Sequence, residues 1–229
     1  MNESADVVAL VPIKEGSLRI PDKNLRPFGG HPTLLHNKIH HLQEAGCFSH
    51  IYVSSDSERI KGITEECGAE YLQREPYLCT GDARWDEVVV GCMNDIPGNP
   101  HVAWAMATSP LFKNYAKGVS LYLDNLGEYD SLVATKAIRE YLIDEAGRPL
   151  FYGFGVWHPY TTEFKPMYAI ADALFVARKS DQILWRYWFG RKPYLQEISS
   201  LEAIDVNFEE DLHMAYAAEL YMQQQQRTQ

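Results

Sequence analysis

Hydrophobic residues along this chain form two kinds of pattern, short continuous runs and longer stretches with helical spacing, and the two kinds alternate. Short runs rich in β-branched residues predict buried strands, here at Val7–Val11, His50–Ser54, Ala69–Gln73, Val102–Met106, Ser131–Thr135 and Tyr168–Ala177. Apolar residues three and four apart predict helices, here at Thr33–Ala45, Glu58–Cys67, Trp85–Met93, Tyr115–Asn125, Lys179–Gly190 and Glu209–Gln223. This alternation favours an α/β fold with a mostly parallel sheet and crossover helices.

Size and composition fit one domain that spans 1–229. Of the 229 residues, 46% are hydrophobic, which is enough for one well-buried core. The net charge of −10 and the pI near 5.2 argue against a nucleic-acid-binding surface, which is normally basic. The opening MNESAD is too polar for a signal peptide, and no apolar run approaches the ~18 residues of a membrane span. We therefore expect a cytoplasmic protein without a membrane segment.

Cysteines and histidines do not have the spacing of a metal site. The four cysteines lack CxxC spacing and fit buried reduced thiols better than disulfides or zinc ligands. His36, His40 and His41 fall in one predicted helix without a suitably spaced acidic partner. We therefore interpret them as partly exposed helix residues.

A cationic loop follows the first predicted strand. Thirteen residues of this acidic chain hold four basic side chains, Lys14, Arg19, Lys23 and Arg26. In open α/β sheets, ligands bind at the carboxyl ends of strands, so the loop suggests an anion site. Gly16 and Ser17 would let backbone N–H groups approach a phosphate whose charge the cations balance. Neither GxxxxGK[ST] nor GxGxxG is present, and the alternative is a surface loop with solvated charges.

The loop carries a recognisable motif, P-x-K-x-G-S-x-R-x-P-x-K-N-x-R-x-F-x-G-x-P, from Pro12 to Pro32. It resembles the opening signature of the acylneuraminate cytidylyltransferase family, which makes CMP-sialic acid, and more distantly that of the deoxyoctulosonate cytidylyltransferases. The matching positions are Pro12, Gly16, Ser17, Pro21, Lys23, Asn24, Gly30 and Pro32. The departures are Lys14 for arginine, Glu15 for glycine and Leu18 for lysine.

The resemblance implies a Rossmann-like, three-layer nucleotidyltransferase fold and transfer of CMP from CTP to an acidic sugar, with release of pyrophosphate. It implies that Arg19 and Lys23 are the catalytic cations on the β- and γ-phosphates, with Lys14 near the α-phosphate. The remaining nucleotide-binding positions would be Leu10, through the backbone after it, with Pro12, Gly16, Ser17 and Asn24.

A second segment strengthens the resemblance. VSSDSERI followed by GAEYLQR parallels V-S-T-D-x-x-x-I and G-A-x-V-x-x-R of the family. The match implies that Arg74 lies near the cytidine nucleotide. In the loop Glu75–Trp85, Ala83 and Trp85 would then be candidates for contact with the base. The alternative for Arg74 is a surface arginine paired with Glu70 or Glu75.

The predicted acceptor site keeps part of the family pattern. Thr108-Ser109-Pro110-Leu111 matches Q-P-T-S-P-L-R, but Met106 replaces the glutamine and Phe112 the arginine. Where the family has N-G-A-x-Y-I, this chain has Ala171–Val176, with Asp172 in place of a glycine. The predicted acceptor-binding residues are Met106, Thr108, Ser109, Asp172 and Phe175. The departures argue against carrying over the family's usual acceptor unchanged.

A magnesium site is predicted in AIDVNFEEDL, Ala203–Leu212, which resembles D-I-D-x-x-x-D-L of the family. Side chains at i and i+2 on a strand end point the same way, which suits one hard cation shared with phosphate oxygens. Asp205 keeps the first metal position, and Asn207 stands at the second with a carbonyl oxygen as its ligand. The acidic residues that follow, Glu209–Asp211, are expected to cap and charge the next helix.

Between Lys136 and Met167 the strand–helix alternation is lost. The segment is rich in Gly, Pro and aromatic residues, among them Phe151, Tyr152, Phe154, Trp157 and Tyr160. Such a patch marks an interface or a ligand groove. In the family this region is an excursion that contacts a second subunit, so we expect a homodimer contact. An aromatic floor under a sugar is the alternative.

Three hypotheses follow for function. The first is a magnesium-dependent cytidylyltransferase that uses CTP and a small acidic sugar. The second keeps the reaction but changes the acceptor to another acid, a phosphate or a phosphonate. The third is a nucleotide-binding relative without turnover, suggested by Lys14, Glu15, Leu18 and Asn207.

Overall fold

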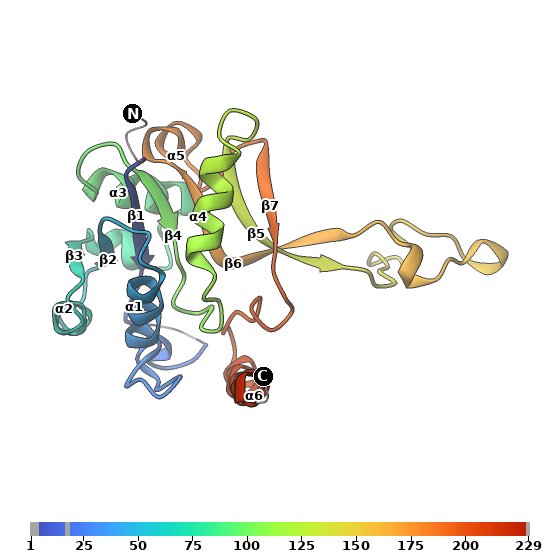
Figure 1. Ribbon diagram of the computed structural model, residues 1–229, viewed down its shortest axis with the longest axis horizontal. Helices are drawn as coiled ribbons and strands as arrows, with labels where there is room; N and C mark the ends of the chain where they lie inside the picture. The colour runs from blue at the N-terminus through green and yellow to red at the C-terminus, as the bar shows by residue number, and fades with distance from the viewer. Residues whose placement is uncertain (1–4, 17–18, 228–229) are drawn as a thin grey trace.

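The computed structural model describes residues 5–16 and 19–227. Within these residues one sheet of seven strands has the order β3-β2-β1-β4-β6-β5-β7 (Figure 1). The strands are β1 Val7–Pro12, β2 Ile51–Ser55, β3 Glu70–Gln73, β4 His101–Trp104, β5 Ser131–Ile138, β6 Met167–Arg178 and β7 Pro193–Glu197. All neighbouring strands pair in parallel except β6, which runs antiparallel to both β4 and β5. The predicted mostly parallel sheet is confirmed.

Helices α1 and α2 begin at side-chain caps. They are α1 Leu34–Ala45, α2 Glu58–Glu66, α3 Trp85–Asp95, α4 Tyr115–Asp124, α5 Lys179–Trp185 and α6 Glu209–Arg227. The Thr33 side chain accepts a hydrogen bond from the backbone N–H of His36, and Ser57 does the same for Ile60. Gly46 ends α1 with a φ of 60°, in the left-handed region that glycine adopts without strain.

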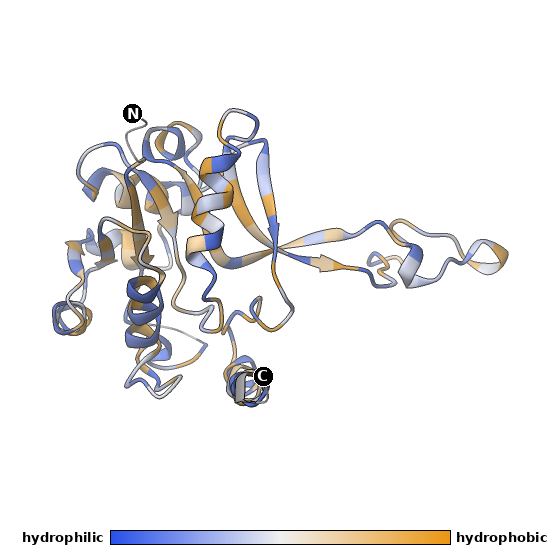
Figure 2. Ribbon diagram, in the orientation of Figure 1, coloured by the Kyte–Doolittle hydropathy of each residue, from blue (hydrophilic) through white to orange (hydrophobic). Residues whose placement is uncertain are grey.

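Two hydrophobic clusters cover the two faces of the sheet and make the predicted three layers. One joins the strands to α1, α2 and α4 through residues such as Leu35, Ile60 and Tyr122. The other joins them to α3 and α5 and contains the fully buried Trp104. Figure 2 shows the hydrophobic strands inside the body beneath helices of mixed hydropathy.

A third cluster fastens the cationic loop to the C-terminal helix. Ile20 and Phe28 of the loop pack against Val206 and against the inner residues Leu212 and Ala215 of α6. This packing brings together two segments that lie almost two hundred positions apart. It therefore positions the Asp205 region beside the loop after β1.

The ends of β5 and β6 leave the body as an arm that contains residues 139–166 (Figure 1). Its aromatic side chains contact one another, for example Tyr141 with Tyr152 and Phe151 with Phe164. The segment 154–160 forms the tip of the arm (Figure 1). In this segment Val156, Trp157 and Tyr160 are 93%, 82% and 77% exposed. The arm lies within the segment 136–167 that was predicted as an excursion, and the ends of that segment belong to β5 and β6. Its role as an excursion for subunit or acceptor contact stays a prediction.

One prediction about the last third of the chain and one about a histidine are wrong, and one strand was not predicted. The helix expected to reach Gly190 ends at Trp185, because Arg186 takes a left-handed conformation with a φ of 54°. Trp188 then stacks on Phe175 instead of continuing the helix. β7 was not predicted, since its half-buried residues show neither a clear run nor alternation. His41 is buried rather than partly exposed.

The described residues contain no helix that combines the length and the hydropathy required to cross a membrane. The cytoplasmic location stays a prediction.

The packing between α4 and the sheet leads to a stability prediction. A Cβ added at Gly118 would lie 2.4 Å from Leu174 Cδ2 and 2.8 Å from Gln196 Oε1, and both side chains are buried. We expect Gly118→Ala to lower the free energy of unfolding by about 1–2 kcal/mol, because overpacking outweighs the gain in helix propensity. Chemical denaturation measures the change.

The matched control for this substitution is Gly62→Ala in α2. A Cβ there meets no atom within 4 Å, so the variant should gain about 0.5–1 kcal/mol from helix propensity. Equal effects of the two substitutions would contradict the packing argument.

Candidate active site

A cleft of about 470 Å³ opens at the carboxyl ends of β1 and β4. Its lining comes from the cationic loop and from the loop after β4, namely Pro12, Lys14, Gly16, Arg19, Lys23, Asn24, Met106, Ala107 and Thr108. A second cavity of about 310 Å³ shares Pro12, Lys14 and Met106 with it and continues towards Arg74 and Trp85. Together they form one elongated site with a strongly cationic end.

Lys23 is the most enclosed cation of the cleft. It lies in a short 3-10 helix, Lys23–Leu25, is only 9% exposed, and its Nζ donates a hydrogen bond of 2.6 Å to the Val206 carbonyl. Burial lowers the pKa of Lys23, and the carboxylate of Asp205 opposes that effect. Arg19 is exposed, with its guanidinium 5.3 Å from the centre of the Phe208 ring. Both predicted catalytic cations thus lie at the cleft and face the Asp205 segment.

The rest of the predicted phosphate loop is held by side-chain contacts. Asn24 Nδ2 donates to the Lys14 carbonyl over 3.3 Å, and Asn24 Oδ1 is buried without a partner among the described residues. Glu15, which replaces a glycine of the family, accepts a hydrogen bond from the Ser57 hydroxyl. Arg59 lies 3.8 Å from Glu15 and 3.6 Å from Asp22, on opposite sides of the loop.

Pro12, Lys14, Gly16 and Asn24 therefore meet at the cleft as predicted. Ser17 lies outside the described residues. Leu10 is fully buried in the core, so only its backbone can take part in binding.

Arg74 is buried at the base of the second cavity. Its Nε donates to Cys79 Sγ over 2.9 Å, and its Nη2 donates to the Ile13 carbonyl. The alternative prediction of a surface arginine paired with a glutamate is therefore wrong. Ala83 and Trp85 line the same cavity as predicted, and the Trp85 ring lies 4.4 Å from that of Trp188.

The predicted acceptor residues separate into two groups. Met106 and Thr108 line the cleft. Ser109 is buried and donates through its hydroxyl to the Asp172 carbonyl over 2.8 Å. Phe175 is fully buried against Trp188, so its side chain does not reach the cleft and cannot contact an acceptor there. Phe175 belongs to the hydrophobic cluster packed against α3 and α5. The register of β6 against β5 shifts between Val133 and Thr135, so simple strand alternation does not predict its side of the sheet.

Asp205 and Asn207 lie together as the i and i+2 pattern predicts. Asn207 Nδ2 donates to Asp205 Oδ2, while Asp205 Oδ1 is buried and has no partner in the described part of the chain. Asp211 accepts from the backbone N–H groups of Asn207 and Phe208, at 2.8 and 2.7 Å, which confirms its predicted capping role. An unpaired carboxylate oxygen beside an amide is a set of donors that suits a hard cation.

Asp172 is the second carboxylate of this region. Burial raises its pKa to about 6, with a further contribution from the negative charge of Asp205. Within residues 5–16 and 19–227, no group of three or more His, Cys, Asp or Glu side chains could hold a metal ion.

Sequence reasoning missed the groups that hold the loop after β4. Lys38 of α1 is fully buried, and its Nζ donates to the Ser109 carbonyl over 2.9 Å. Asn37, next to it, donates to the Pro110 carbonyl over 3.0 Å. A lysine at a core position of a predicted amphipathic helix is the signal that could have identified this contact.

A larger hollow of about 680 Å³ lies at the opposite, amino end of β1. It is lined by Val7, Phe48 and Leu123 together with the acidic Asp6 and Asp124, and no Lys or Arg among the described residues lines it. Its chemistry does not suit a polyphosphate. The cationic cleft is therefore the candidate site.

Comparison with known proteins shows the family of the chain. A family described as cytidylyltransferase has a sequence model that matches residues 8–146. N-acylneuraminate cytidylyltransferase of Streptococcus agalactiae serotype V is 26% identical over 218 residues, which cover 89% of this chain and 51% of that protein. The 3-deoxy-manno-octulosonate cytidylyltransferase of Myxococcus xanthus is 32% identical over 89 residues, 39% of this chain and 36% of that protein. The chain spans about half the length of the N-acylneuraminate relatives that it matches.

Solved structures show the same fold. A CMP:2-keto-3-deoxy-manno-octonic acid synthetase complexed with CTP has a TM-score of 0.66 at 13% identity, covering 96% of this chain and 100% of that one. The 4-diphosphocytidyl-2C-methyl-D-erythritol synthase of Anaerococcus prevotii has a TM-score of 0.64 at 12% identity, covering 96% and 99%. The predicted Rossmann-like fold and the resemblance drawn from the β1 loop are confirmed.

The segment matched by the family model is more than half of the chain and contains every residue that lines the two cavities. The chain belongs to the cytidylyltransferase family.

Proposed function

We propose that this chain transfers CMP from CTP to an acidic sugar of the nonulosonate or octulosonate kind, with release of pyrophosphate. The observation that carries the proposal is the gathering of Lys14, Arg19 and Lys23 around one cleft of a chain with a net charge of −10. The names of the curated relatives support an acid sugar as the acceptor.

In the proposed reaction an acceptor oxygen attacks the α-phosphorus of CTP. A new O–P bond forms as the bond from the α-phosphorus to the pyrophosphate oxygen breaks. No protein nucleophile is needed, so the residues act by positioning and by stabilising charge. Lys23 and Arg19 would bind the β- and γ-phosphates and balance the charge of the leaving pyrophosphate. Lys14, shared by both cavities, would lie at the α-phosphate between them.

The second cavity would hold the cytosine base and the ribose. Trp85 and Ala83 offer an apolar wall, and Arg74 forms the base of the cavity while it holds the Ile13 carbonyl at the end of β1. Met106 stands between the cavities, where it would separate the nucleotide from the acceptor.

Asp205 and Asn207 fit a magnesium ion, because Asp205 Oδ1 is a buried oxygen without a partner among the described residues. When bound, the ion would supply positive charge to the triphosphate oxygens and would polarise the attacking hydroxyl. Asp205 would orient it through the free oxygen, and Asn207 would add a neutral ligand.

A changed acceptor is the second candidate function. Phe112, which replaces the family's arginine, is fully buried against Tyr115 and offers no charge to a carboxylate. Asp172 adds a carboxylate close enough to feel the charge of Asp205. These residues favour an acceptor that presents hydrogen-bond donors on this side, and a panel of sugar acids, phosphates and phosphonates separates the candidates.

The aromatic arm supports a homodimer. Side chains as exposed as Val156 and Trp157 can be buried only against another molecule. A second copy of this chain carries the same arm and can form a symmetric contact with it. We propose that the arm forms the contact between two subunits. The alternative, an aromatic floor under the acceptor, would apply to the partner's cleft.

The catalytic role of Lys23 leads to a first prediction. Lys23→Met should lower the rate of pyrophosphate release from CTP and N-acetylneuraminate or 3-deoxy-manno-octulosonate by about 10²-fold or more, because the triphosphate loses a desolvated charge contact. Lys61→Met, which removes an exposed cation of α2 outside the cleft, is the control and should keep full activity. Full activity of Lys23→Met would reject the assignment. CTP-specific thermal stabilisation of the wild type without pyrophosphate release on any acceptor would favour a non-catalytic relative.

The pKa of Asp172 gives a prediction for stability without divalent cations. The pKa is about 6 in the folded protein and 3.8 in the reference state, so between these values the folded state binds more protons and its stability falls as pH rises. Asp172→Asn should abolish this slope and raise the free energy of unfolding at pH 7 by on the order of 1–3 kcal/mol.

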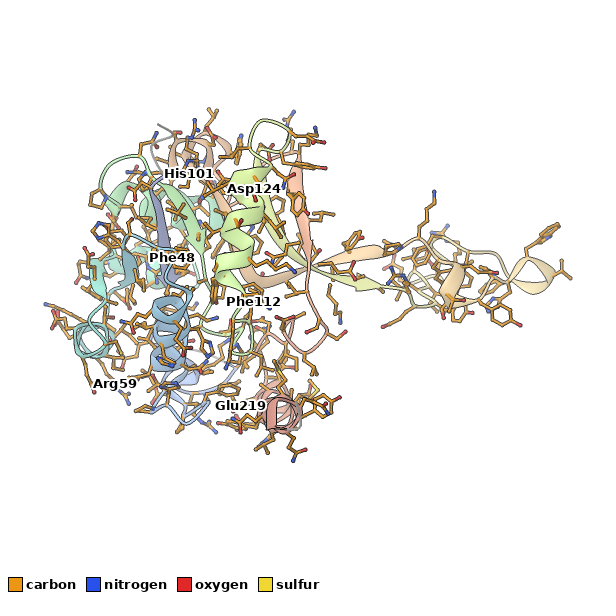
Figure 3. All side chains as sticks on the ribbon, in the orientation of Figure 1. Phe48, Arg59, His101, Phe112, Asp124 and Glu219 are labelled. Carbon is orange, nitrogen blue, oxygen red and sulfur yellow. The ribbon has the colours of Figure 1, made fainter. Side chains whose placement is uncertain are left out.

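Denaturation at pH 4 and pH 7 measures the slope. Asp124→Asn, at the far end of α4 (Figure 3), removes a charge outside the site and serves as the control. The advantage of Asp172→Asn should shrink when Mg²⁺ is added, because the ion offsets the charge that the variant removes. The same slope in Asp172→Asn and in the wild type would contradict the pKa argument.

The arm gives a prediction for assembly. Combined Val156→Ser and Trp157→Ser substitutions should weaken self-association by at least about tenfold, because they remove exposed apolar area from the tip. Sedimentation equilibrium measures the dissociation constant. Leu184→Ser, at a side chain that is 77% exposed on α5, is the control and should leave it unchanged. A wild type that stays monomeric over the same concentration range would overturn the proposed dimer.

A further inference from the structure

A buried lysine lies beneath the acceptor side of the cleft. Lys38 of α1 is fully buried, and no acidic side chain of the described residues contributes to its pKa. Its Nζ donates to the Ser109 carbonyl over 2.9 Å and is hydrogen-bonded to the Tyr115 hydroxyl. The surroundings, between α1 and α4 where Figure 3 labels Phe48 and Phe112, are aromatic. Burying an amine there is costly, and an apolar side chain would fill the same space.

The Ser109 carbonyl is one of three successive carbonyls that are all held by donors from other segments. The Thr108 carbonyl accepts from the Val206 N–H over 2.8 Å, and the Pro110 carbonyl accepts from Asn37 over 3.0 Å. The Ser109 hydroxyl in turn donates to the Asp172 carbonyl over 2.8 Å. The loop after β4 is thus fixed from α1, from the Asp205 segment and from β6.

These bonds connect Lys38 to the chemistry of the cleft. Thr108 lines the cleft, and its carbonyl is bound to Val206, whose own carbonyl accepts from Lys23 over 2.6 Å. Val206 lies between Asp205 and Asn207. A shift of the Ser109 carbonyl would therefore move Thr108 and disturb the segment on which Lys23 and Asp205 depend.

We propose that Lys38 is a positioning residue for nucleotidyl transfer, whose buried amine holds the Ser109 carbonyl and so sets the acceptor wall at Thr108 against the Asp205 segment. The expected effect of Lys38 on turnover rests on the proposed function. Its expected effect on the position of the loop after β4 does not.

The charge state of the amine supports this role. Burial lowers the pKa of Lys38 to about 7. A neutral amine can donate to Ser109 and accept from the Tyr115 hydroxyl at the same time, which satisfies both groups without a buried charge. The titratable groups that face it are Tyr115 of α4, whose pKa burial raises, and His41 of α1, whose pKa is lowered to about 2 by burial and also by Lys38. Both remain neutral at neutral pH.

The test compares Lys38→Met with Ile39→Val, its fully buried neighbour on α1. For Lys38→Met we expect kcat/KM for the sugar acid to fall about 10²-fold while KM for CTP changes less than twofold, because the acceptor wall is misplaced. Hydrogen exchange of residues 106–111 should also become faster in this variant. Ile39→Val, which loses only packing, should change neither readout. The acceptor probes are N-acetylneuraminate and 3-deoxy-manno-octulosonate.

A pH series supplies an independent signature. Between about pH 7 and the usual lysine pKa of 10.5, the unfolded state holds a proton on Lys38 that the folded state lacks, so this group makes stability rise with pH. The melting temperature of the wild type relative to Lys38→Met should therefore increase from pH 7 to pH 10.

Unchanged kinetics and unchanged exchange in a folded Lys38→Met protein would overturn the proposal. If Lys38→Met does not fold, Tyr115→Phe removes one partner of the amine, and unchanged exchange and kinetics in that variant would overturn it equally. If the wild type turns over neither acceptor, the proposed function fails. The exchange and pH readouts then still decide the role of Lys38.

Discussion

The structure depends on one constraint, which is that the loop leaving β4 has three successive backbone carbonyls that need donors. Buried carbonyls without partners are costly, and here the donors come from Lys38 and Asn37 of α1 and from the backbone of Val206. Two of the donors belong to α1 and the third belongs to the Asp205 segment. The hydrogen bonds to the three carbonyls therefore also fix α1 and the Asp205 segment around the cleft. The geometry of the site follows from ordinary hydrogen-bond requirements.

The cations of the cleft are arranged to bind an anion. Lys23 is almost buried, and its amine is held by a neutral carbonyl rather than by a carboxylate. Asp205 is near enough to favour the charge on Lys23, and yet it keeps a buried oxygen free of partners among the described residues. A polyphosphate would take the cations and a hard cation would take the free oxygen. Under the proposed function the two ligands would complete each other, and one aspartate would serve where the family pattern has two.

Local patterns predicted six of the seven strands of the described sheet, the helices and the phosphate loop, because these depend on neighbours in sequence. Lys23 and Asn24 could be placed at the cleft since their spacing from β1 fixes them. The position of Phe175 could not be predicted in this way. Its side of β6 depends on an irregularity in the pairing of β5 with β6, where the register shifts between Val133 and Thr135. Lys38 has a core position in its helix, which signals burial, but the Ser109 carbonyl that it binds lies in a distant segment and could not be predicted from local pattern. The end of α5 was also not predicted, because the stacking of Trp188 on Phe175 is a contact between segments that are distant in sequence.

The arm shows the limit of what a single copy of the fold explains. In the body, every strand is covered by helices or by neighbouring strands, and large apolar side chains are buried on both faces of the sheet. In the arm, the rings of Tyr141, Tyr152 and Phe164 pack on one another and bury only Phe164. A ribbon of two strands is marginal without further cover, yet this one carries the exposed Val156 and Trp157 at its tip. The tip therefore gains most from burial against a second surface. The chain can reach such a surface because β6 runs antiparallel to β5, so that the two strands leave the body as a hairpin.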